Sequence, residues 1–260
     1  MGSVWAARDE RLGRDVAIKF MSPDLTADAG YRQRFEDEAR AAARLASPHV
    51  VTLFDHGVWE GAPYIVFERL TGVDLALRLQ ASGPLPDELS VLIAVHLGRA
   101  LDAAHAEGIV HRDIKPQNVF LVGAPGTPDE ELVVKLLDFG IAKQEGSGAL
   151  QTKTGILVGS PHFMSPEQIR GGRSLLPASD LFSLAALLYR CVVGRLPFDG
   201  ADTGRVLLQI TRDDCPAPSS VREELATEVD EVFARALARD KAERFASGRE
   251  LASALKLALA

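Results

Sequence analysis

Two short segments of the sequence bring together side chains that could hold a metal ion and neutralise a phosphate group. The first, HRDIKPQN at 111–118, contains Asp113, Lys115 and Asn118, and the second, LLDFG at 136–140, contains Asp138. Carboxylate and amide oxygens are the hard donors that suit Mg²⁺. An isolated aspartate in a loop is more often a turn or cap residue. The order and spacing of two uncommon segments nevertheless favour an active site.

These segments resemble those of the protein kinase superfamily, specifically the bacterial Hanks-type serine/threonine kinases, and the resemblance extends over nearly the whole chain. It implies transfer of the γ-phosphoryl of ATP to Ser/Thr hydroxyls of proteins, with Mg²⁺ as the metal. It assigns proton acceptance to Asp113 and contact with the transferring phosphate to Lys115. Asn118 and Asp138 would hold the Mg²⁺. His111 would pack beneath the loop and transfer no proton.

A lysine and a glutamate earlier in the chain form a candidate ion pair. In VAIK at 16–19, strand alternation places Ala17 and Lys19 on one face, which is expected to line the nucleotide cleft. Glu38 falls on one face of a predicted helix, among the apolar residues Phe35, Ala42 and Leu45. A carboxylate on a buried face is costly unless it is paired. We therefore predict a Lys19–Glu38 ion pair, at the separation that the kinase family uses.

The resemblance also implies a pocket for the adenine of ATP. Phe67, in the segment PYIVFERL at 63–70, is expected to guard the back of this pocket. The backbone groups of Glu68 and Leu70 are expected to bind the adenine edge. Apolar contacts above and below the base would come from Val4, Ala17 and Phe120, although each of these positions alone is more often plain core.

A second set of residues is expected to regulate or support the site. Arg112 precedes the predicted base, and kinases with arginine there are commonly activated by phosphorylation of the activation segment. Thr152 and Thr154 are the candidate phosphorylation sites, because a phosphate could pair with Arg112 and order the loop. A structural ion pair is expected between Glu167 and Arg244. Asp180 could be a helix N-cap, and the resemblance implies that it also anchors the backbone of the catalytic loop; both roles can hold together.

The periodicity of the sequence predicts an α+β fold with the two lobes of a protein kinase. Residues 1–69 predict a small antiparallel sheet with one helix, because β-type runs alternate with turn signals at 11–13 and 60–61. One of the expected strands is the run HVVTLFDHG at 49–57. Residues 70–260 predict a larger, mainly helical lobe with one short strand pair. Its long helical segments are 85–107, 178–193 and 229–237.

The sequence departs from the kinase pattern in two places. Of the glycine-rich loop G-x-G-x-x-G-x-V only the end is present, as Gly2-Ser3-Val4, so the first strand and two glycines are missing. Since that loop covers the phosphates, a pseudokinase or scaffold with impaired nucleotide binding is the alternative to an active enzyme. The segment GAPGTPDEE at 123–131 lengthens the hairpin before the metal loop and is predicted to lie on the surface without an assigned role.

Composition limits the remaining possibilities. The 260 residues carry a formal net charge of −7 without a basic run, which disfavours nucleic-acid binding. The longest apolar stretch is too short to cross a bilayer, and the first residues lack the features of a secretory signal. Two cysteines, interpreted as reduced thiols, favour a cytoplasmic location. The expected partners are protein substrates and, for autophosphorylation, a second copy of the kinase.

Overall fold

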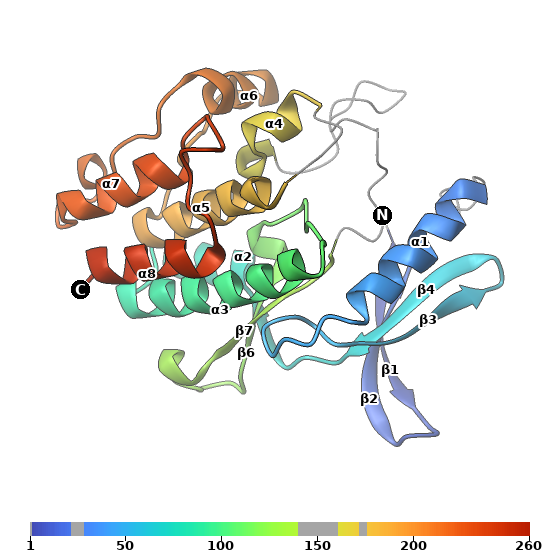
Figure 1. Cartoon of the computed structure of the whole chain (residues 1–260). Coiled ribbons are helices and arrows are strands. Elements are labelled where there is room, and N and C mark those ends of the chain that lie inside the picture. The colour runs from blue at the N-terminus through green and yellow to red at the C-terminus, as the bar shows by residue number, and fades with distance from the viewer. Residues whose placement is uncertain (1, 22–28, 140–160, 172–175) are drawn as a thin grey trace.

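The computed structural model describes residues 2–21, 29–139, 161–171 and 176–260, with the backbone alone for residues 29–34 and 38. In Figure 1 a small lobe built on a sheet adjoins a larger lobe built mainly of helices. This arrangement confirms the predicted two-lobed α+β fold. The predicted boundary between residues 69 and 70 stays a prediction.

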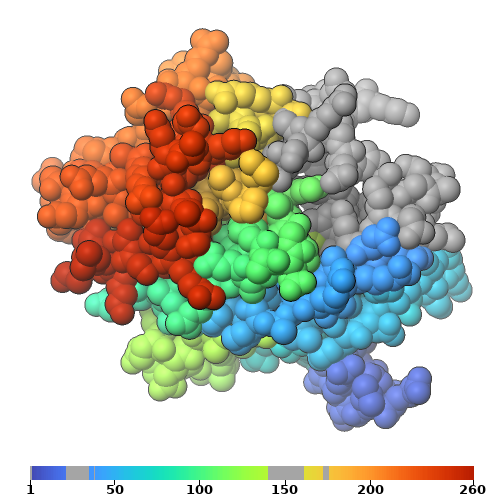
Figure 2. Space-filling model, in the orientation of Figure 1, coloured from blue at the N-terminus to red at the C-terminus, as the bar shows by residue number. Residues whose placement is uncertain are grey.

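The sheet of the small lobe contains four antiparallel strands in the order β1-β2-β4-β3. The strands are β1 (Ser3–Asp9), β2 (Arg14–Phe20), β3 (Leu53–Trp59) and β4 (Ala62–Glu68). The two predicted hairpins are present, with Gly13 at φ 65° and Gly61 at φ 82°, a region that glycine enters without steric cost. Figure 2 shows the β1–β2 hairpin projecting from the rest of the molecule.

Helix α1 (Ala29–Ala42) packs against the sheet and closes the small core. This core contains the buried side chains of Met21, Phe35, Ala39, Ile65 and Phe67. Cross-strand pairing sets Lys19 opposite Ile65 and Ala17 opposite Phe67. Because paired residues share a face of the sheet, Ala17 and Lys19 lie on the face that carries this core.

A second sheet lies in the large lobe, with three antiparallel strands in the order β5-β6-β7. They are β5 (Gly72–Asp74), β6 (Val119–Val122) and β7 (Val133–Leu136). The sequence predicted one strand over 49–57, but β3 begins only at Leu53. Residues 49–51 instead run beside β7, where Val51 N–H donates to the Leu136 carbonyl and Leu136 N–H donates to the His49 carbonyl. The small lobe is thus hydrogen-bonded to β7, the strand that precedes Asp138.

The large lobe is built around α3 (Asp87–Ala106) and α5 (Pro177–Val193), which match two of the predicted helical segments. Helix α8 (Gly248–Ala258) crosses α3 where Gly98 meets Gly248. A Cβ on Gly98 would lie 2.6 Å from the Gly248 carbonyl oxygen, so only glycine permits this crossing. The other helices of this lobe are α2 (Leu75–Ser82), α4 (Pro166–Ile169), α6 (Thr203–Arg212) and α7 (Thr227–Ala236).

Among the described residues, no helix combines the length and the apolar character that crossing a membrane requires.

The predicted ion pair between Glu167 and Arg244 is present and is bidentate. Arg244 Nη1 lies 2.8 Å from Glu167 Oε1, and Nη2 lies 3.0 Å from Oε2. The Arg244 side chain is fully buried and also donates to the carbonyls of Ala178 and Ala238. Burial alone would raise the pKa of Glu167, but the hydrogen bonds and charge of Arg244 outweigh it and lower the pKa below its ordinary value.

Arg244→Met is expected to lower the free energy of unfolding by about 3–5 kcal/mol, because a partly buried carboxylate and three backbone carbonyls lose the guanidinium donor. Arg249→Met is the matched control. Arg249 is 72% exposed and lies 3.4 Å from Asp102, so its loss should change stability by less than about 1 kcal/mol. Urea unfolding of both variants measures the difference, and equal midpoints would contradict it.

Candidate active site

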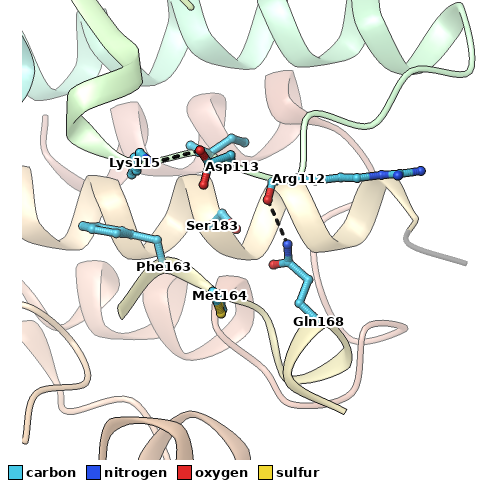
Figure 3. Close-up of a pocket in the computed structure, with 8 residues that line it drawn as sticks. Arg112, Asp113, Lys115, Phe163, Met164, Gln168 and Ser183 are labelled. Carbon is cyan, nitrogen blue, oxygen red and sulfur yellow. Dashed lines mark hydrogen bonds and ion pairs between the residues drawn. The ribbon is translucent and has the colours of Figure 1, made fainter. Parts of the chain in front are cut away.

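The catalytic loop brings three of the predicted residues into direct contact. Lys115 Nζ lies 2.9 Å from Asp113 Oδ2, and Figure 3 draws this contact as a dashed line. Asn118 Nδ2 donates to the backbone carbonyl of Asp113 at 2.8 Å and to its Oδ2 at 3.1 Å. The short 3₁₀ turn Pro116–Asn118 folds the segment back, so that Asn118 reaches the residue five positions before it. The Asp113 carboxylate is thereby held in one orientation by a cation and an amide.

Asp180 anchors this loop from helix α5. Its buried carboxylate accepts the backbone N–H groups of His111 at 2.7 Å and Arg112 at 2.9 Å, and it lies 2.8 Å from His105 Nε2. Arg112 has φ 67°, a strained value for a residue with a side chain, so these bonds hold the loop in an unfavourable conformation. The anchoring prediction is confirmed. The N-cap prediction is wrong, because the helix begins at Pro177 and Leu176 occupies the cap position.

His111 lies beneath the loop, as predicted. It is fully buried, its Nε2 lies 2.7 Å from the Leu137 carbonyl, and its Nδ1 accepts the Asp113 N–H at 3.2 Å. An acceptor Nδ1 requires that Nε2 carries the proton. Burial lowers the pKa of His111, which keeps the ring neutral and suits it to a structural role.

Gln168 supports the catalytic loop and was not found from the sequence. Its side-chain Nε2 donates to the Arg112 carbonyl at 3.0 Å. Its Oε1 accepts the Ser165 N–H at 2.9 Å, and Ser165 Oγ in turn accepts the Gln168 N–H. The signal was available, because serine followed three residues later by glutamine is a capping box. With Phe163, Met164 and Ser183, Gln168 lines a pocket beside Asp113.

Asp138 lies next to Asn118 because β6 and β7 pair antiparallel. Val119 is opposite Leu136, and Leu137 N–H donates to the Asn118 carbonyl at 2.8 Å. Asp138 has φ 54° and its Oδ2 lies 2.6 Å from Lys19 Nζ. Lys19 therefore reaches the end of the large-lobe sheet from the small lobe. The side chain of Glu38, its predicted partner, lies outside the described residues, so the Lys19–Glu38 pair stays a prediction.

The donor set suits a hard divalent cation. Both Asn118 Nδ2 contacts go to Asp113, which leaves the amide oxygen as the donor for a metal. The Asp138 carboxylate supplies charged oxygens from the neighbouring strand end. An amide oxygen and a carboxylate are ligands that Mg²⁺ accepts.

The predicted nucleotide residues are divided between the lobes. Ala17 and Phe67 are cross-strand neighbours, and Val4 pairs with Lys19 on the same face. Phe67 is buried, whereas Val4 is 66% exposed. Gly2 packs closely on β2, where a Cβ would lie 1.8 Å from the Phe20 carbonyl oxygen. The remaining position, Phe120, lies on β6 of the large lobe.

A cluster at the join of the lobes was not predicted. The carboxylate of Glu68, at the end of β4, accepts hydrogen bonds from Thr52 N–H and from Lys135 on β7. Burial alone would raise the pKa of Glu68, but these donors outweigh it and lower the pKa below its ordinary value. Nothing in the local sequence indicates this cluster, because its members are separated by 16 and 67 positions.

The paired threonines and the lengthened hairpin are the other predicted features, and only the hairpin lies within the described residues. Thr152 and Thr154 lie outside the described residues, so their role stays a prediction. The lengthened hairpin at 123–131 is largely exposed, as predicted. It is also attached to α2, because Arg78 Nη2 lies 3.0 Å and 3.2 Å from the two carboxylate oxygens of Asp129.

The two-lobed fold, with an aspartate, lysine and asparagine in one loop and an aspartate after the next strand, defines a protein kinase domain. The family model described as the protein kinase domain matches residues 1–255, so the chain belongs to the protein kinase family.

Several relatives of the chain are bacterial kinases. It is 38% identical over its full length to the serine/threonine-protein kinase PknE of Mycobacterium bovis, covering 44% of that protein. It is 35% identical to a probable serine/threonine-protein kinase of Corynebacterium efficiens, covering 99% of this chain and 39% of the relative. The crystal structure of the Mycobacterium tuberculosis PknI kinase domain matches with a TM-score of 0.77 and 30% identity, covering 98% of this chain and 89% of that one. The chain thus spans less than half the length of the curated relatives it matches.

Proposed function

We propose that this chain is the catalytic domain of a serine/threonine protein kinase, which transfers the γ-phosphoryl of ATP to Ser/Thr hydroxyls of proteins. The observation that carries the proposal is the contact of Asp113 with both Lys115 and Asn118. A carboxylate oriented in this way can accept a proton, and an adjacent lysine can neutralise a phosphate. The relatives named as serine/threonine kinases support the choice of acceptor.

In the transfer, one bond to the γ-phosphorus forms and one breaks. The oxygen of the substrate hydroxyl bonds to the γ-phosphorus, the bond from that phosphorus to the oxygen bridging the β- and γ-phosphates breaks, and ADP leaves. Asp113 accepts the hydroxyl proton. Lys115 neutralises charge on the group in transfer.

Asn118 and Asp138 would hold Mg²⁺, and Lys19 lies where it can bind the phosphates. When bound, Mg²⁺ neutralises the phosphate oxygens and orients them. At the join of the lobes, Glu68 N–H already donates to the Thr52 carbonyl at 3.0 Å. We therefore assign the Glu68 carbonyl and the Leu70 N–H to the adenine edge, with Val4, Ala17, Phe67 and Phe120 around the base.

The pseudokinase alternative is not favoured. It depends on the incomplete glycine-rich loop alone, whereas Lys19, Asp113, Lys115, Asn118 and Asp138 are all present. Incubating the chain with γ-labelled ATP, Mg²⁺ and an acceptor protein tests the proposal directly. We expect label on serine and threonine that depends on Mg²⁺. Nucleotide binding without transfer would support the pseudokinase.

Activation by phosphorylation is proposed for Thr152 and Thr154. A phosphate there adds nearly two negative charges that Arg112 could pair with. Incubation with Mg²⁺ and ATP is expected to raise the activity on an acceptor protein on the order of tenfold, about the effect of one charge-assisted hydrogen bond. The variant carrying Thr152→Ala and Thr154→Ala should lose this rise, and Thr227→Ala, in an exposed position, should keep it. Mass spectrometry locates the phosphates, and activation of the double variant would refute the assignment.

The proposed setting is cytoplasmic, where ATP and protein substrates are available. Both cysteines are free thiols, which fits a reducing compartment. A second copy of the kinase is the proposed partner in autophosphorylation. An initial rate that rises with the square of the kinase concentration would support transfer between copies, whereas a first-order rate would indicate transfer within one chain.

A further inference from the structure

Three segments that are distant in the sequence meet at the join of the lobes. Thr52 lies just before β3, Glu68 ends β4 and Lys135 lies in β7. We infer that Lys135 is a positioning residue for ATP, which acts through Glu68 to fix the adenine-binding backbone above the large lobe. The inference rests on the proposed adenine site at Glu68 and Leu70.

Glu68 is held by more contacts than a surface carboxylate usually makes. Its Oε1 accepts Thr52 N–H at 2.7 Å and Thr52 Oγ1–H at 2.9 Å, and it also receives the Lys135 ammonium group. Its own N–H donates to the Thr52 carbonyl at 3.0 Å. Side chain and backbone of Glu68 are therefore both restrained. The end of β4 cannot shift without breaking several of these bonds together.

Lys135 connects this restraint to the floor of the proposed nucleotide site. In the β6–β7 pairing Lys135 is directly opposite Phe120, one of the predicted apolar contacts of the adenine and the one that lies in the large lobe. Cross-strand partners project to the same face of a sheet, so the Lys135 side chain rises beside the Phe120 ring. By binding Glu68, Lys135 sets the height of the adenine-binding backbone above Phe120.

The strand that carries Lys135 is itself firmly placed. Val134 N–H donates to His96 Nδ1 at 3.2 Å, and the Val134 carbonyl lies 3.2 Å from His49 Nδ1. The two imidazoles stack with their centroids 4.0 Å apart. Thr52 comes shortly after His49, so the chain that binds Glu68 is also attached to β7. Lys135 consequently lies on a strand that is held in place by these contacts, which a positioning residue requires.

The Lys135–Glu68 ion pair is more buried than an ordinary surface pair. The side chains of Lys135 and Glu68 are 13% and 24% exposed. Removing the lysine would leave a carboxylate partly buried beside the adenine site with only its Thr52 donors. The Arg78–Asp129 pair has both side chains 33% exposed. It joins helix α2 to the hairpin between β6 and β7, and it does not contact Glu68. It therefore provides a matched control.

The test compares Lys135→Met with Arg78→Met in the full chain. For Lys135→Met we expect KM and Kd for ATP to rise about tenfold, with kcat at saturating ATP within about twofold of wild type, because pre-organisation of the site is lost and the catalytic loop is kept. Lys135→Arg, which can still reach the carboxylate, should restore most of the ATP affinity. Arg78→Met should change neither constant. An unchanged Kd for ATP in Lys135→Met, with a loss of thermal stability equal to that of Arg78→Met, would overturn the inference.

Two further variants keep the test decisive. If Lys135→Met does not fold, Thr52→Val removes one donor to Glu68 with little change of shape, and it should raise Kd for ATP by a smaller factor. An unchanged Kd in that variant would count against the inference. Leu70→Pro removes the N–H assigned to adenine. If Leu70→Pro abolishes ATP binding while Lys135→Met has no effect, the positioning role alone is wrong. If Leu70→Pro binds ATP normally, the proposed adenine site is wrong and the role of Lys135 falls with it.

Discussion

Asp113→Asn is expected to lower kcat for phosphoryl transfer by about 10²–10⁴-fold, the usual contribution of a general base. Asparagine has the shape of aspartate and keeps an oxygen for the Lys115 and Asn118 contacts, but it cannot take a proton. The loop should therefore keep its conformation, and Kd for ATP should stay close to the wild-type value. Steady-state transfer of labelled phosphate measures kcat, and nucleotide titration measures Kd.

Asp129→Asn is the matched control for this substitution. Asp129 lies in the lengthened hairpin and contacts Arg78, so the same chemical change there should leave kcat unaltered. If Asp113→Asn retained kcat within about threefold of wild type, well below the range expected for a general base, Asp113 would not be the base.

Asp138→Asn is expected to lower kcat/KM by about 10²–10³-fold at millimolar Mg²⁺, comparable to the loss of one charged group that stabilises a transition state. The substitution removes a negative charge from the proposed metal site and also the partner of Lys19 at 2.6 Å. Because the metal site is weakened rather than deleted, higher Mg²⁺ concentrations should recover part of the activity. Activity measured over a range of Mg²⁺ concentrations tests this.

The dependence on metal separates this variant from Asp113→Asn. The Asp113 variant should show the wild-type dependence on Mg²⁺ with a lower maximum, whereas the Asp138 variant should show a curve displaced to higher Mg²⁺. A wild-type midpoint in Asp138→Asn would exclude Asp138 as a metal ligand. A displaced midpoint in Asp113→Asn would indicate that the two carboxylates share the metal.

Local patterns of the sequence predicted most of the elements. The hairpin turns at Gly13 and Gly61 were predictable because only a few residue types adopt a positive φ without cost. The helices α3 and α5 were predictable from their apolar periodicity. The contacts among Asp113, Lys115 and Asn118 span five residues, so their closeness follows from the local turn.

Two assignments made from local patterns were wrong because distant parts of the chain supply competing partners. Asp180 was expected as a possible N-cap, but Pro177 begins the helix earlier and the carboxylate is used by backbone groups about 70 residues away. Residues 49–51 were assigned to a strand of the small lobe. They bond to β7 instead, because that strand offers backbone partners that no local pattern reveals.

The sequence by itself determined the kinase fold and the charged groups proposed for phosphoryl transfer, since these groups lie in short contiguous segments with recognisable residue types and spacing. The tertiary structure decided how these groups are held. Lys135 reaches Glu68 across 67 positions, and Gln168 reaches the Arg112 carbonyl across 56. Such contacts arise when packed elements bring side chains together, and chain separation leaves no periodic signal of them in the sequence.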